Sequence, residues 1–155
     1  MKGRGRLLAL IAMVGLGSLA FTGTPAGAIP GSGCTRPIVI SRLAFGPGTI
    51  LPSQKSTARL AGRNCTKHPR SVSIQWSGSF SGTSTAGCPV FDPFVQTISV
   101  PKASALLAHV VYLVPKGCEA TVLTVNARVT DAKGAVISNK HASLRIAHKP
   151  AKTAT

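Results

Sequence analysis

The chain has 155 residues, with 18 lysines and arginines against three acidic residues, which gives a formal net charge of +15 at pH 7. A positive field of this strength favours anionic partners such as nucleic acid, acidic polysaccharide, wall phosphopolymers or anionic lipid, and the association weakens with salt. Three acids are too few for the paired-carboxylate sites of glycosidases or for acid-rich calcium loops, so the composition argues against both.

The first 28 residues have the pattern of a secretory signal peptide. Lys2, Arg4 and Arg6 precede an apolar run over residues 7–20, and the small residues at 26–28 fit a cleavage site. The apolar run is shorter than the roughly 20 residues that span a bilayer. We therefore expect it to be removed, and we expect no transmembrane segment.

Cleavage after Ala28 leaves a chain of 127 residues that starts at Ile29 and carries a formal charge of +12. We predict one domain over residues 29–147 and a basic flexible tail over residues 148–155. The predicted location is extracellular, either free or loosely associated with the cell wall. Lipid anchoring is the less favoured alternative, because Cys34 does not directly follow the apolar run.

All four cysteines follow the signal peptide, at positions Cys34, Cys65, Cys88 and Cys118. An even number of cysteines in an exported chain indicates two disulfides. Cys65 and His68 have the spacing of half a zinc site, but a structural zinc site needs a second close pair of ligands. The other cysteines stand alone, so we predict disulfides, no metal and no cofactor.

Apolar residues repeat with a period near two, which is typical of strands with one buried and one solvated face. Val72, Ile74 and Trp76, for example, alternate with serines and a glutamine. A flexible Gly/Ser/Thr loop is expected over residues 77–87. The sequence predicts an all-β fold, a two-sheet antiparallel sandwich of about seven strands: residues 37–45, 55–63, 71–77, 94–100, 105–114, 120–130 and 135–147.

Three segments characterise this order of strands: QKSTARLAG in the second strand, VSIQWSG with its core tryptophan in the third, and the closing hairpin ATVLTVNARVTDAKGAVISN followed by HASLRIA. The pattern resembles the immunoglobulin-like and fibronectin-III-like domains of bacterial secreted proteins. The resemblance implies an immunoglobulin-like sandwich and names no activity, because such sandwiches have many functions. Unlike the cysteines of antibody domains, all four here fall outside the predicted strands.

That departure predicts how the cysteines pair. If consecutive strands alternate in direction, Cys34 and Cys65 lie at one end of the sandwich, and Cys88 and Cys118 lie at the other. A disulfide needs Cα atoms about 4.4 to 6.8 Å apart. We therefore predict bridges between Cys34 and Cys65 and between Cys88 and Cys118.

Basic residues gather in the loops and strand ends at the Cys34 and Cys65 end, where Asp131 is the one acid. The hypothesis is that they form an anion-binding end held in shape by the disulfide. The alternative is ordinary solvated loops, since loops are where charged residues usually lie. The candidate residues are Arg36, Arg63, Lys67, Arg70, Lys102 and Lys133.

Catalytic patterns are missing from the sequence. Residues 78–82 read GSFSG, with Phe80 where a nucleophile elbow has serine. The basic loop has no interleaved aromatic residues for base stacking, which argues against sequence-specific nucleic-acid binding. We predict a non-enzymatic secreted binding or structural module for anionic cell-envelope or extracellular polymers. The alternative is a small exported inhibitor or toxin-like protein that acts on a protein partner through residues 77–93.

Overall fold

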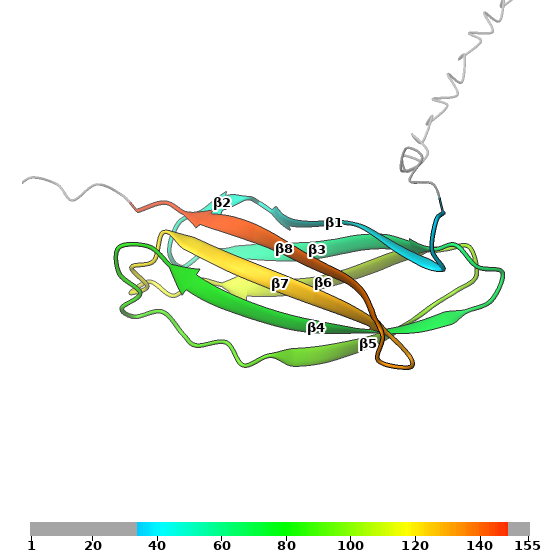
Figure 1. The fold of residues 1–155 in the computed structure, drawn as a ribbon. Coiled ribbons are helices and arrows are strands. Elements are labelled where there is room, and N and C mark those ends of the chain that lie inside the picture. Colours follow the sequence, from blue (N-terminus) through cyan, green and yellow to red (C-terminus); the bar gives the residue numbers. More distant parts are fainter. Residues whose placement is uncertain (1–33, 149–155) are drawn as a thin grey trace, which may run out of the picture. The chain divides into compact units, whose positions relative to one another are not determined.

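The computed structural model describes residues 34–148, and the predicted signal peptide and residues 149–155 lie outside this range. Eight strands make up the described part (Figure 1). They are β1 (Ile38–Gly46), β2 (Thr49–Ile50), β3 (Lys55–Asn64), β4 (Arg70–Ser81), β5 (Phe94–Val100), β6 (Ala105–Leu113), β7 (Val122–Asp131) and β8 (Val136–Ile146).

The strands form two sheets, as the alternation predicts. One sheet has three strands in the order β1-β3-β6, and the other has five in the order β2-β8-β7-β4-β5. Every pair is antiparallel except β2 with β8. In Figure 1 the three-stranded sheet lies behind the five-stranded one. The all-β, two-sheet prediction is confirmed, and each of the seven predicted strands overlaps one of β1 and β3 to β8.

The eighth strand, β2, was not predicted, because two residues are too few to show an alternation. After Gly46 the chain leaves the three-stranded sheet, and Thr49 and Ile50 pair with the end of β8. Buried Ser56 on β3 donates a hydrogen bond to the carbonyl of Pro47 and so secures the crossing. Strand β2 runs in the same direction as β1. The directions of β1 and of β3 to β8 therefore still alternate along the chain.

The prediction of a flexible loop over residues 77–87 is wrong for its first part. Strand β4 continues to Ser81, and residues 77–81 pair with residues 122–126 of β7. Glycine and serine have low strand propensity, but pairing with β7 on one side overrides it. Gly78 also leaves room for the ring of Phe91, which a Cβ atom would approach to 3.1 Å.

The core lies between the sheets and follows the predicted alternation. Val72, Ile74 and Trp76 on β4 are buried, and the indole Nε1 of Trp76 donates to Oε1 of Gln96 at 3.2 Å. Burial raises the pKa of the Tyr112 phenol above its ordinary value. The other large, fully buried side chains are Leu60, Leu106, Leu123, Leu144, Ile146, Val100, Val114, Val125 and Val129.

Candidate anion-binding end

The two predicted disulfides are confirmed. The Cα atoms of Cys34 and Cys65 are 5.7 Å apart, and those of Cys88 and Cys118 are 4.3 Å apart. The first bridge joins the segment before β1 to the loop after β3. The end of the sandwich that carries residues 34–37, 65–69, 101–104 and 132–135 is called the basic end below.

Asn64, the last residue of β3, ties two of these segments together, residues 65–69 and residues 101–104. Its side chain is fully buried. Its Nδ2 lies 2.8 Å from the carbonyl oxygen of His68, 3.1 Å from that of Val100 and 3.0 Å from that of Pro101. Its Oδ1 accepts hydrogen bonds from the backbone N and the Oγ1 of Thr66. One buried amide therefore fixes the loops on both sides of it.

Asp131 organises another of these segments, the turn between β7 and β8. One carboxylate oxygen, Oδ1, accepts hydrogen bonds from the backbone N atoms of Lys133 and Ala135, each at 2.9 Å. Gly134 adopts a φ of +81°, a conformation that glycine takes at no steric cost. One oxygen of the carboxylate is thus held by the backbone of its own turn, which fixes the position of this acid.

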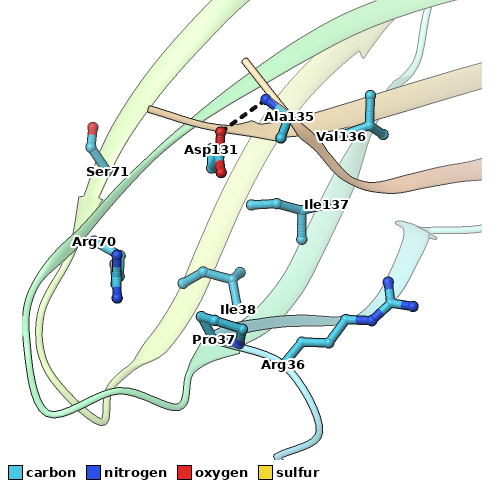
Figure 2. A pocket seen from close by; sticks show the side chains of 9 residues that line it. All are labelled: Arg36, Pro37, Ile38, Arg70, Ser71, Asp131, Ala135, Val136 and Ile137. Carbon is cyan, nitrogen blue, oxygen red and sulfur yellow. Dashed lines mark hydrogen bonds between the residues drawn. The ribbon is translucent and has the colours of Figure 1, made fainter. Parts of the chain in front are cut away.

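A hollow of about 250 Å³ opens between the start of β1, the start of β4 and the β7–β8 turn. Figure 2 shows Arg36 and Arg70 on opposite sides of it, with Ile38 and Ile137 between them. A hollow of about 240 Å³ adjoins it at Arg70 and Asp131 and extends to Lys133. A third, of about 330 Å³, adjoins it at Arg36 and extends to Lys140.

These three adjoining hollows form a strip, called the basic groove below, which is lined by Arg36, Arg70, Lys133 and Lys140 with Asp131 as its one acid. Of the six candidate residues, Arg36, Arg70 and Lys133 line the groove. The other three do not: Lys67 and Lys102 lie exposed in their loops, and Arg63 lies on the exposed side of β3.

Lys140 is a groove residue that was not among the candidates. It pairs with Ala127, which is fully buried, so it occupies a position on the core side of β8. The alternation of Ala142, Leu144 and Ile146, extended toward the N-terminus, places residue 140 on that same side. A lysine at an inward position was the available signal for an opening at the edge of the sandwich.

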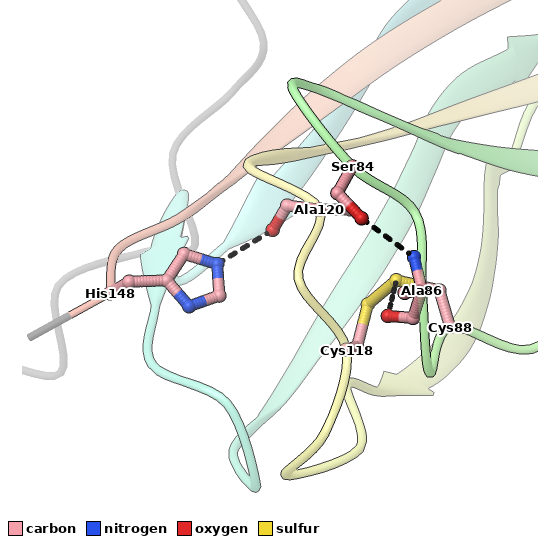
Figure 3. The surroundings of a disulfide bond; sticks show 6 residues. All are labelled: Ser84, Ala86, Cys88, Cys118, Ala120 and His148. Atoms are coloured by element: carbon pink, nitrogen blue, oxygen red, sulfur yellow. Dashed lines mark hydrogen bonds between the residues drawn. A yellow bond between two sulfur atoms is a disulfide. The ribbon is translucent and has the colours of Figure 1, made fainter.

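The opposite end carries the β4–β5 loop, which is anchored rather than loose. Ala86 accepts a hydrogen bond from the backbone N of Glu119 at 3.0 Å and donates one to Oγ of Ser84 at 3.1 Å. Figure 3 shows Ser84 and Ala86 near the Cys88–Cys118 bridge, and His148 against the carbonyl of Ala120. Beyond the bridge, Phe91 stacks on Phe80 with ring centroids 5.3 Å apart.

No helix in the described range is long and apolar enough to cross a membrane. Residues 34–148 also contain no group of three His, Cys, Asp or Glu side chains placed to hold a metal ion.

Comparison with known proteins yields neither a matching family model nor a matching curated protein. Among solved structures, a β-glucosidase from Erythrobacter marinus is similar at 9% identity and a TM-score of 0.53, over 71% of this chain and 15% of that one. An alkylpurine DNA glycosylase from Pseudomonas fluorescens is similar at 10% identity and a TM-score of 0.50, over 72% of this chain and 31% of that one. A Niemann-Pick type C2 protein from the Japanese carpenter ant gives 14% identity and a TM-score of 0.45, over 72% and 94% of the respective chains. The chain thus spans less than a third of the two enzymes, and the likeness to them concerns the fold alone.

Proposed function

We propose that this protein is a secreted, non-enzymatic, immunoglobulin-like module that binds anionic cell-envelope or extracellular polymers in the basic groove. The observation that carries the proposal is the lining of the groove, which holds four cations, Arg36, Arg70, Lys133 and Lys140, and one acid, Asp131. Charged groups at the rim of such a strip attract a polyanion and orient it along the seam between the sheets.

The strand order supports the immunoglobulin-like part of the proposal. In immunoglobulin sandwiches strands G, F and C are neighbours in one sheet, and A, B and E belong to the other. Here β8, β7 and β4 are consecutive neighbours, and β1, β3 and β6 make the second sheet. The buried Trp76 on β4 is in the strand where those domains carry their core tryptophan. Strand β5 lies beside β4, as strand C′ lies beside C in variable-type domains.

The experiment is retention of the disulfide-bonded protein on immobilised polyphosphate, polygalacturonate and uncharged dextran across a salt series. The double variant Arg36→Gln/Arg70→Gln is expected to bind the anionic polymers roughly tenfold more weakly than the wild type. The reason is that each exposed charge contact contributes about 1 kcal/mol or less to binding, and the variant removes two of them. The slope of affinity against salt should also become shallower, because fewer counterions are displaced.

The matched control is Lys67→Gln/Lys102→Gln, which removes the same charge from the same end outside the groove. If the groove is the site, the control pair has a clearly smaller effect. Equal effects of the two pairs would mean that only the general positive field of the basic end matters. Equal retention of the wild type on dextran would overturn the proposal.

A second candidate function, inhibition of a partner protein, is favoured by the anchored β4–β5 loop. Val90 is 93% exposed and lies between the disulfide at Cys88 and the packed ring of Phe91. A side chain presented on a loop held at both sides loses little entropy on entering a cleft. The expected result is stoichiometric inhibition of an elastase-type protease, reduced at least tenfold by Val90→Asp. Cleavage of the loop as an ordinary substrate, or no effect on the protease, would rule this function out.

A further inference from the structure

The outer face of the three-stranded sheet carries large apolar side chains that nothing in the described chain covers. On strand β6, Leu107 is 71% exposed, Val111 is 55% exposed and Leu113 is 50% exposed. Alternate residues of this strand, Leu106, Ala108 and Tyr112, are buried in the core. Strand β6 is therefore apolar on both faces, although only one of them is covered.

A row of cations runs beside these apolar residues on the neighbouring strand. Lys55 pairs with Leu113, Arg59 with His109 and Arg63 with Ala105, so each cation lies on the same face as its partner. Successive cations are four residues apart, about 13 Å along a strand. The three acids of the chain, Asp92, Glu119 and Asp131, lie outside β1, β3 and β6.

The five-stranded sheet provides the comparison within the same molecule. Its outer face carries mainly polar side chains, with Ser73 beside Thr97 at 3.2 Å and Thr124 beside Ser143 at 3.4 Å. Two exposed arginines, Arg128 and Arg145, also lie there, and Val95 is an exposed apolar residue on the same face. This mainly polar character is usual for a solvated face in an antiparallel sheet. The apolar row on β6 departs from it, and exposed apolar groups next to charged ones mark interaction surfaces.

We propose that this face, formed by Leu107, Val111 and Leu113 together with Lys55, Arg59 and Arg63, docks flat onto an anionic lipid surface. The apolar side chains enter the boundary between headgroups and acyl chains, while the long basic side chains reach the anionic headgroups. Each cation near such a surface adds to the attraction. This surface is separate from the basic groove and does not depend on it.

A lipid surface fits better than the other candidate occupants. A second copy stacked on the same face would bring two rows of Lys55, Arg59 and Arg63 together, and like charges repel. A partner strand added to the free edge of β6 would pair with its backbone, but the exposed side chains stand perpendicular to the sheet and would remain largely uncovered. A flat anionic layer satisfies the cations and covers the apolar row at the same time.

The experiment is flotation of the protein beginning at Ile29, so that the apolar leader does not itself bind lipid. The vesicles are either phosphatidylcholine alone or phosphatidylcholine with phosphatidylglycerol. We expect binding to the anionic vesicles. Leu107→Thr/Val111→Thr should weaken it roughly tenfold by removing buried apolar area, and Arg59→Gln/Arg63→Gln should weaken it to a similar degree and reduce its dependence on salt.

Matched controls keep this result distinct from unfolding and from the groove. Val90→Thr/Val95→Thr removes two exposed valines elsewhere, and Arg128→Gln/Arg145→Gln removes two exposed arginines from the five-stranded sheet. All four pairs should retain the emission of Trp76, the single tryptophan, which is buried and reports folding. Arg36→Gln/Arg70→Gln should leave vesicle binding at near wild-type strength.

Three outcomes would overturn the lipid proposal. One is equal binding to neutral and anionic vesicles that survives Leu107→Thr/Val111→Thr. Another is binding that Val90→Thr/Val95→Thr weakens as much as Leu107→Thr/Val111→Thr. The last is a dimer in sedimentation equilibrium that Leu107→Thr/Val111→Thr dissociates, which would make the face a contact between two copies of this chain.

Discussion

Substitution of Asn64 by aspartate is expected to destabilise the protein by about 3 kcal/mol or more, although the two side chains have nearly the same shape. In the wild type Nδ2 donates to three backbone carbonyls and Oδ1 accepts two hydrogen bonds from Thr66. An ionised aspartate has no donor, so three carbonyl oxygens would face a buried negative charge. A neutral aspartic acid would supply one donor in place of two. Urea unfolding followed by the emission of Trp76 measures the loss.

The matched control is Asn126→Asp, which makes the same chemical change at an exposed position of β7. We expect it to alter the free energy of unfolding by about 0.5 kcal/mol or less, as is usual for surface positions. If Asn64→Asp behaves like this control, Asn64 does not hold the loops of the basic end together. If it is destabilising but still folds at low temperature, weaker retention on polyphosphate would show that the same amide also positions the segment before Arg70.

The strands and the disulfide pairing were predictable because both follow from alternation. Residues 72, 74 and 76 and residues 123, 125, 127 and 129 are buried as their period of two requires. The pairing follows once strand directions alternate, and β2 leaves that count unchanged. Local sequence did not reveal β2 or the last residues of β4, because both depend on pairing with strands more than 40 residues away.

The sequence predicted at which end of the sandwich the candidate site lies, but not which residues line it. Loop cations were assigned together because they share an end, but which of them face one another depends on how the two sheets meet along their edge. That geometry places Arg36 and Arg70 on opposite sides of one hollow and leaves Lys67 and Lys102 outside. The two residues that sequence reasoning missed, Asn64 and Lys140, share a signal. Each is a polar residue at an inward position of its strand, where the alternation otherwise places apolar or small side chains.

The second large effect concerns the disulfides, which should contribute unequally although they close loops of nearly equal length. The paired cysteines are 31 and 30 residues apart, so the chain-entropy model assigns each bridge about 3 to 4 kcal/mol. Cys118 is 1% exposed and belongs to the core, whereas Cys34 is exposed. Cys88→Ala/Cys118→Ala should therefore cost about 1 kcal/mol more than Cys34→Ala/Cys65→Ala, because it also removes buried sulfur and loosens the β4–β5 loop.

Urea unfolding of the two double variants separates the contributions of the unfolded and the native state. Removing either cross-link lets the unfolded chain expand and expose more surface. The free energy of unfolding should therefore fall more steeply with urea concentration, to a similar extent in both variants. The extra loss of stability in Cys88→Ala/Cys118→Ala arises in the native state. It should therefore appear without any further change in slope relative to Cys34→Ala/Cys65→Ala. Equal losses would mean that the packing of Cys118 contributes nothing. A larger loss in Cys34→Ala/Cys65→Ala would instead mean that the bridge at the basic end also supports the loops that Asn64 holds. The stability of the groove would then depend on both the Cys34–Cys65 bridge and the side chain of Asn64.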